Sequence, residues 1–289
     1  MRDAYISFFR VLPAFLAVAI MTLHVRAQQR PGGERDELVR QGVQLDLEGK
    51  GTEARAMFQK AIDNAPTPAA KANAQRAMAM SWAFEGNCKK TAEFENLVIE
   101  YWRTQETSAP ENAFYQEGEI ADEAARVCID NGDVNTAYEL YKKGHDLGLK
   151  EPNISAGRKD LWDYRWEHAQ ARIAARRGNR ADAEKHVTAA KSVLEDMKQK
   201  DTKLYEQQTN FLPYLTGYVA LYTGDYKTAL EELQKANPND PFVQCLMGMA
   251  YEKLGDRSKA EEAYRRAAEA RGHNPPAAFA HHFARSKVG

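Results

Sequence analysis

The sequence predicts an all-α protein built as a solenoid of about six antiparallel helix hairpins. Glycines at positions 86, 132, 178 and 224 recur at an interval of 46 residues, and each is followed by Asn or Asp. Small and large apolar residues recur at fixed distances on both sides of these glycines. A fixed period of a few tens of residues is typical of a solenoid. The composition, 43% hydrophobic and 28% charged, is that of an ordinary soluble chain.

The first 27 residues are predicted to form a secretory signal peptide. Arg2 and Arg10 are followed by the apolar run VLPAFLAVAIMTLHV and by VRA, which ends at Ala27. This order of charged, apolar and small residues is typical of a cleaved leader, and the run is shorter than the ~20 residues that span a bilayer. Residues 28–33 then form a short linker. The alternative is an uncleaved N-terminal membrane anchor.

A cleaved leader predicts an exported protein, either periplasmic or secreted. Its removal leaves a mildly acidic chain of net charge −3, against −1 for the whole sequence. Neither value favours a nucleic-acid partner, and we expect membrane contact only through an uncleaved leader.

Each Gly-Asn or Gly-Asp pair is expected to form a tight turn between two helices. Gly, Asn and Asp tolerate left-handed backbone angles that other residues resist. Gly49 and Gly255 add one turn on each side of the regular series, which gives a helical array over residues 34–272.

The residues around these turns indicate how the two helices pack. A small residue lies seven positions before the glycine and a large one nine after it, as in Gly42 with Phe58. Small residues let antiparallel helices approach closely, and the large residue fills the space beside them. The unit around Gly86 departs from this pattern because Thr91 and Glu95 stand at the expected apolar positions. We therefore expect a shifted frame there, with Ala92 and Phe94 facing the core.

These residues and offsets resemble the tetratricopeptide repeat family, most specifically around Gly49 and Gly255. The resemblance covers most of the chain after Glu34. It implies a right-handed superhelix in which the first helix of each pair lines the concave face. The interval of 46 exceeds the family period of about 34, so the central units need longer helices or connections. The tail, residues 273–289, is expected to add a short capping helix after Pro276 or to remain frayed.

Two stripes on neighbouring first helices form the candidate partner-binding site. Residues 13, 10, 6 and 2 before each turn glycine share one helical face. Before Gly178 and Gly224 these are Arg165, His168, Arg172 and Arg176, then Phe211, Tyr214, Tyr218 and Tyr222. Arginine binds carboxylates and tyrosine offers an apolar face with a polar tip, which favours a protein or peptide partner with an acidic or carboxylate group near Arg172.

A second interpretation of the two stripes is purely structural. The arginines would pair with the acidic stripe of the preceding unit, which contains Glu119, Asp122 and Asp130, and the aromatic residues would be core. Pro213 lies within the aromatic stripe and can shift the start of that helix.

The sequence leaves two alternatives open for the state of Cys88 and Cys128 and predicts one state for Cys245. Cys88 and Cys128 are expected at similar heights on adjacent helices, so they either form a disulfide or remain two buried thiols. Cys245 is predicted to be free and to stand at a position facing the groove.

The sequence contains no motif for a metal, a cofactor or a catalytic centre, and we predict none of these and no enzyme. The favoured function is an exported protein-protein interaction scaffold that binds a partner segment in its concave groove. One alternative is a structural subunit of a cell-envelope assembly that uses its convex face or its termini. A less favoured one is an enzyme on a helical-repeat scaffold.

Overall fold

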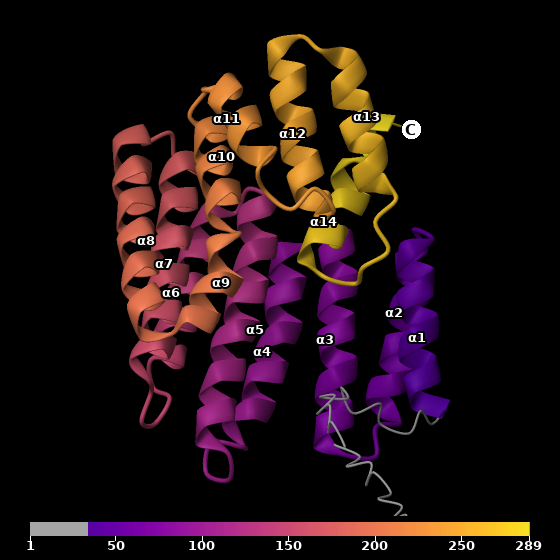
Figure 1. Cartoon of the computed structure of the whole chain (residues 1–289). Coiled ribbons are helices and arrows are strands. Elements are labelled where there is room, and N and C mark those ends of the chain that lie inside the picture. Colours follow the sequence, from indigo (N-terminus) through magenta and orange to yellow (C-terminus); the bar gives the residue numbers. More distant parts are fainter. Residues whose placement is uncertain (1–33, 289) are drawn as a thin grey trace, which may run out of the picture. The chain divides into compact units, whose positions relative to one another are not determined.

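The computed structural model describes residues 34–288, and within that range every regular element is a helix (Figure 1). In chain order the helices are α1 (Glu34–Leu47), α2 (Gly51–Asp63), α3 (Pro68–Phe84), α4 (Cys88–Arg103), α5 (Pro110–Asp130), α6 (Val134–Gly148), α7 (Ala156–Arg176), α8 (Arg180–Lys200), α9 (Thr202–Thr209), α10 (Leu212–Tyr222), α11 (Tyr226–Leu233), α12 (Pro241–Leu254), α13 (Arg257–Ala268), α14 (Pro275–Phe283) and α15 (Arg285–Val288). The predicted signal peptide and linker lie outside the described residues. Between residues 34 and 288, no helix is both long and apolar enough to cross a bilayer.

Six hairpins make up most of the described part of the chain: α1–α2, α3–α4, α5–α6, α7–α8, α10–α11 and α12–α13. All six predicted turn glycines have positive φ. At Gly86 the φ of 68° lets the next amide, that of Asn87, donate to the carbonyl of Trp82 at 3.0 Å, the bond that closes a helix C-terminus. The predicted all-α solenoid of about six antiparallel hairpins is confirmed, and its turns lie where the glycines are.

The Asn or Asp after the turn glycine has a role that differs from the expected one. Its backbone is not left-handed, and its side chain caps the second helix instead. The Asn87 side chain accepts from the Lys90 amide at 3.0 Å, and Asp256 accepts from the Lys259 amide at 3.2 Å. The Gly-Asn and Gly-Asp pairs therefore end one helix and begin the next with adjacent residues.

The spacing of small and large residues brings each pair of helices into close contact. A Cβ atom added at Gly42 would lie 2.5 Å from the Phe58 ring, and one at Gly217 would lie 2.6 Å from Leu233 Cγ. Gly248 packs in the same way against Tyr264. A side chain at these glycines would clash, so the first helices need glycine for the hairpins to close.

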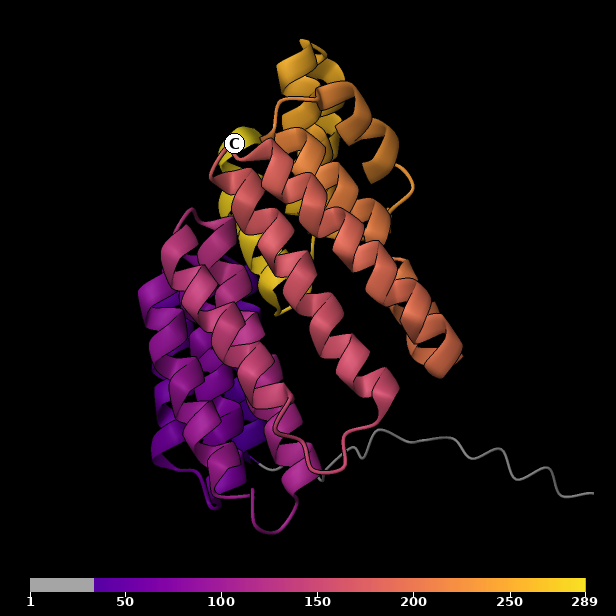
Figure 2. The ribbon, with the colours of Figure 1, turned by 90° about the vertical axis from the view of Figure 1, so that its left-hand side faces the viewer.

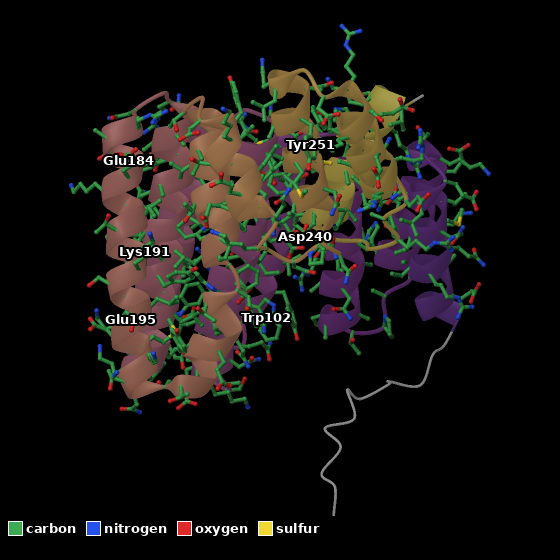
Figure 3. The ribbon with its side chains drawn as sticks, turned by 45° about the horizontal axis from the view of Figure 1, so that its top comes forward. Trp102, Glu184, Lys191, Glu195, Asp240 and Tyr251 are labelled. Atoms are coloured by element: carbon green, nitrogen blue, oxygen red, sulfur yellow. A yellow bond between two sulfur atoms is a disulfide. The ribbon has the colours of Figure 1, made fainter. Side chains whose placement is uncertain are left out.

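The longer central units result from longer helices and one additional helix. Helices α5, α7 and α8 each have 21 residues. The eight-residue α9 connects α8 to α10 and packs against α8. The outer side of α8 carries exposed charges, among them Glu184, Lys191 and Glu195 (Figure 3).

The C-terminal segment folds back onto the first helices of the early hairpins. Helix α14 packs against α3, α5, α12 and α13, and Figures 1 and 2 show it in yellow beside them. Its Ala278 shares a buried cluster with Phe84 of α3 and Val127 of α5. Just before α14, His273 Nε2 lies 2.9 Å from the buried Asp46 carboxylate. The tail therefore contains a helix that ties the last hairpin to the first three. It also fills part of the face lined by the first helices, which we call the inner face.

A disulfide joins Cys88, the first residue of α4, to Cys128 near the end of α5. The two Cα atoms are 4.7 Å apart and the bridge closes 40 residues of chain. Cys245 is free but buried in the core of the last hairpins. The expectation that it faces a groove is wrong, because Cys245 is packed in a buried apolar cluster with residues of α10 to α14.

We expect reduction of the Cys88–Cys128 bond to lower the free energy of unfolding by roughly 4 kcal/mol, because the bond restricts a long loop of the unfolded chain. Urea unfolding with and without reductant measures this. Under denaturing conditions a thiol reagent should label only Cys245 before reduction and all three cysteines after it. Labelling of all three without reductant would contradict the disulfide.

Candidate functional site

The inner face contains a cavity of about 480 Å³. Its walls come mainly from first helices of successive hairpins, with contributions from α6, from the α9–α10 junction and from the start of α14. The lining residues are Arg76, Glu119, Asp122, Glu123, Arg126, Tyr141, Tyr164, Arg165, His168, Arg172, Gln208, Phe211, Tyr214, Asn274 and Pro275. Five of the eight residues predicted from the stripes line this cavity, namely Arg165, His168, Arg172, Phe211 and Tyr214.

The remaining three predicted residues lie elsewhere. Arg176 donates to the Tyr222 hydroxyl at 3.0 Å and stacks on its ring. Tyr218 is fully buried and packs beside Phe242 in the core of the last hairpins. A binding stripe open along its whole length is therefore not formed. Tyr218 is core, Arg176 and Tyr222 are partly buried against each other, and the other five residues line the cavity.

Arg165 forms an ion pair across two hairpins, as the structural interpretation expected. Its guanidinium lies 2.6 Å from the Glu119 carboxylate of α5. Arg76 of α3 pairs in the same way with Glu123 of α5. Two of the carboxylates that line the cavity thus already have an arginine partner.

Arg172 has no such carboxylate partner, although its side chain is only 5% exposed. Its two terminal nitrogens donate to the Tyr141 hydroxyl at 2.6 Å and the Tyr214 hydroxyl at 3.3 Å. Its Nε atom has no hydrogen-bond partner. Tyrosine hydroxyls are neutral, so the charge of this buried guanidinium is not balanced by the bonds that hold it.

His168 stands one turn before Arg172 and is 9% exposed. Its ring stacks on Tyr214, and its Nε2 atom has no hydrogen-bond partner. Burial lowers the pKa of His168 well below its ordinary value, and Arg172 and Arg126 lower it further. His168 is therefore a neutral donor or acceptor in this cavity at physiological pH.

Arg126 of α5 lines the cavity but was not among the residues predicted from the sequence to bind a partner. Its guanidinium stacks over the Phe242 ring of α12, with 5.2 Å between the guanidinium carbon and the ring centroid. Its Nε lies 3.7 Å from Asp130 Oδ2, longer than a hydrogen bond, and has no other partner. Burial raises the pKa of Asp130 to about 6. The approach of α12 to α5 depends on the curvature of the array, which the offsets do not encode.

The third carboxyl in the lining, Asp122, differs from its paired neighbours. Burial raises its pKa to about 7, an effect that Glu119 adds to and that Arg165 and Arg172 oppose. The side chain is thus partly neutral near pH 7. The lining combines four arginines with three carboxyl groups, so positive charge is in excess there.

Phe211 marks the mouth of the cavity, and 47% of its surface is exposed. It is the N-cap of α10, which begins at Leu212 with Pro213 in its first turn. The expected effect of Pro213 on the start of this helix is therefore seen as a break between α9 and α10. Because of this break, Phe211 and Gln208 lie at the cavity rather than on a continuous helix.

Glu95 of α4 is buried next to the cavity residues Arg76 and Glu123. Its burial shows that the shifted frame expected for the α3–α4 hairpin is wrong. Thr91 and Glu95 are fully buried in the regular frame, whereas Ala92 and Phe94 are only partly buried. Neither carboxyl oxygen of Glu95 has a hydrogen-bond partner. Burial raises the pKa of Glu95 well above its ordinary value, and Glu123 raises it further against the opposing effect of Arg76.

The described residues contain no group of three or more His, Cys, Asp and Glu side chains placed to hold a metal ion. Burial also raises the pKa of the Cys245 thiol, which opposes formation of the reactive thiolate. The chemistry that the cavity offers is recognition of charge and of flat apolar groups.

Comparison with known proteins supports the repeat assignment at the C-terminal end. Residues 243–274, which include most of α12 and all of α13, match the tetratricopeptide repeat. No curated protein matches the chain.

Two solved structures are similar to the chain at low identity. The first contains nearly identical TPR-like repeats of a protein described as a kinesin light chain from Podosopora anserina. The match has 15% identity, covers 81% of this chain and 92% of that one, and has a TM-score of 0.40. The second is the TPR domain of P58(IPK), with 12% identity, 88% and 98% coverage, and a TM-score of 0.27.

The buried Glu95 carboxyl predicts that stability falls as pH rises. The unfolded chain loses this proton near its ordinary pKa of about 4.5, while the folded protein keeps it to higher pH. The free energy of unfolding therefore decreases above that value. Glu95→Gln should raise the melting temperature relative to the parent at pH 8 and change it little at pH 4.5. Glu93→Gln, on the exposed side of the same helix, is the control. An equal effect of Glu95→Gln at both pH values would contradict the assignment.

Proposed function

We propose that this protein is an exported scaffold that binds a segment of a protein partner on the inner face of its helical array. One observation carries the proposal. Five of the residues predicted to contact a partner surround a single cavity on that face, and one of them, Phe211, is exposed at its mouth. Helical-repeat arrays present such surfaces to partners.

The partner segment would lie across the cavity mouth, between α7 and the α9–α10 junction. Phe211 supplies an apolar contact there and Arg165 supplies a charge that is partly exposed. An acidic side chain or terminal carboxylate of the partner would point toward Arg172. The fold-back of α14 leaves less of the inner face open than a fully exposed groove would have, so the contact would be short.

Paired variants distinguish this proposal from the competing one, in which the protein is a structural subunit that uses its outer face. Capture of binding proteins from the native host by the full-length chain identifies a partner, and its affinity is then measured for Arg165→Gln, Phe211→Ala and Lys191→Gln. The first and the third remove the same charge, from the inner and the outer face. We expect the two inner-face changes to weaken binding about tenfold each and Lys191→Gln to leave it unchanged. Loss of binding on Lys191→Gln alone would favour the outer face.

Export makes a separate prediction. The N-terminal residue of the protein purified from its native host should be Gln28, because VRA at positions 25–27 precedes the expected cleavage point. N-terminal sequencing and fractionation of the cells measure this. A protein that begins at Met1 and sediments with membranes would instead support the uncleaved anchor.

A further inference from the structure

The cavity holds two buried arginines that form no hydrogen bond with a carboxylate and share one nearby acid, Asp130. Glu119 and Glu123 pair with Arg165 and Arg76. Arg172 is bonded to tyrosine hydroxyls, and Arg126 has an acid only at 3.7 Å. A buried charge without a matching partner is costly. A ligand that carries negative charge would remove much of that cost.

Two unused guanidinium donors and one unpartnered imidazole nitrogen are found at the same place. Arg126 Nε, Arg172 Nε and His168 Nε2 have no partner, and all three residues line the cavity. Arg172 and His168 are more than nine-tenths buried. A donor buried without an acceptor destabilises a fold, whereas an oxyanion can accept from several donors at once.

The N-terminus of α10 lies at the cavity and favours the same sign of ligand charge. Its N-cap, Phe211, is in the lining, and the amides of a helix N-terminus carry partial positive charge and attract anions. The start of α14 offers no free amide, because Pro275 and Pro276 have no N–H and the Ala277 amide donates to the Asn274 side chain. The effect of α10 adds to that of the arginines and would not suffice without them.

The size of the cavity and the position of α14 favour a compact ligand over an extended chain. A volume of about 480 Å³ is that of a small-molecule site. Helix α14 packs on α3 and α5 beside it, which stops a long segment from continuing along the inner face. The rings of Tyr164, Tyr214 and Phe211 give the cavity an aromatic wall against which a flat apolar body can lie.

We propose that this cavity binds a small organic acid, in which a carboxylate or phosphate group is carried on a compact apolar body. The oxyanion lies between Arg126 and Arg172 within reach of His168, and the body lies toward Phe211 at the mouth. Binding of a small acid goes beyond the proposed binding of a protein partner, because the ligand is not a macromolecule.

Isothermal titration calorimetry on the purified full-length protein tests the proposal with benzoate, phenyl phosphate and benzamide. Benzamide has the shape of benzoate without the charge, so it is the matched neutral probe. We expect saturable binding of benzoate, phenyl phosphate or both, and at least tenfold weaker binding of benzamide. Equal affinities for benzoate, phenyl phosphate and benzamide would overturn the proposal.

Two variants locate the binding site. Arg126→Gln removes one of the two charges and leaves the hydrogen bonds of Arg172 in place, so we expect the acid to bind about tenfold more weakly or worse. Arg177→Gln removes the same charge from an exposed position outside the cavity. This variant should bind the acid as tightly as the parent does. If Arg126→Gln fails to fold, His168→Gln replaces it. Equal losses in the cavity variant and in Arg177→Gln would overturn the assignment.

A third arm separates a free small molecule from an acidic protein segment. An acetylated tetraglutamate peptide is titrated beside benzoate and phenyl phosphate. Binding of the peptide with no binding of either small acid would assign the cavity to the protein partner and overturn this inference. The inference is supported if benzoate or phenyl phosphate binds at least as tightly as the peptide does.

Discussion

The left-handed glycine followed by a capping Asn or Asp is the constraint on which the rest of the structure depends. It ends the first helix and begins the second within three residues, so it fixes where each hairpin turns. In the central units the turns lie at a constant interval, which places equivalent residues of successive first helices at the same height. The pairing of Arg165 with Glu119 follows from that alignment, and Arg172 bonds to Tyr214, which lies one turn before its equivalent residue on α10.

The same alignment accounts for the unusual charge of the inner face. First helices normally bury apolar stripes between neighbours, yet here α5 and α7 bring acids and arginines together. Most of these charges neutralise one another, and the cost of burying them falls with each pair formed. Arg126 and Arg172 do not complete this pattern. Their position in a cavity with an aromatic wall makes them a site for recognition rather than for stability alone.

The repeat and its turns could be predicted from the sequence because they depend on neighbouring residues. A glycine, its cap and the small residue seven positions earlier act within one hairpin, so their spacing is visible in the chain. The return of α14 to α3 and the stacking of Arg126 on Phe242 join hairpins far apart in sequence. They depend on the curvature of the array, which no local offset records. The buried Glu95 was mispredicted for a different reason. Its polar side chain suggested that the frame of the α3–α4 hairpin is shifted, whereas the hairpin keeps the regular frame and buries the carboxyl.

The central claim is that the inner face ends in a positively charged cavity between Arg126 and Arg172. A crystal structure of the protein soaked with 4-bromobenzoate tests it most directly, because the anomalous signal of bromine locates the ligand. The account predicts one site in the cavity, with the carboxylate within hydrogen-bond distance of both guanidinium groups and the bromine toward Phe211. A cavity filled by the protein's own side chains, or bromine found only on the outer surface, would contradict it.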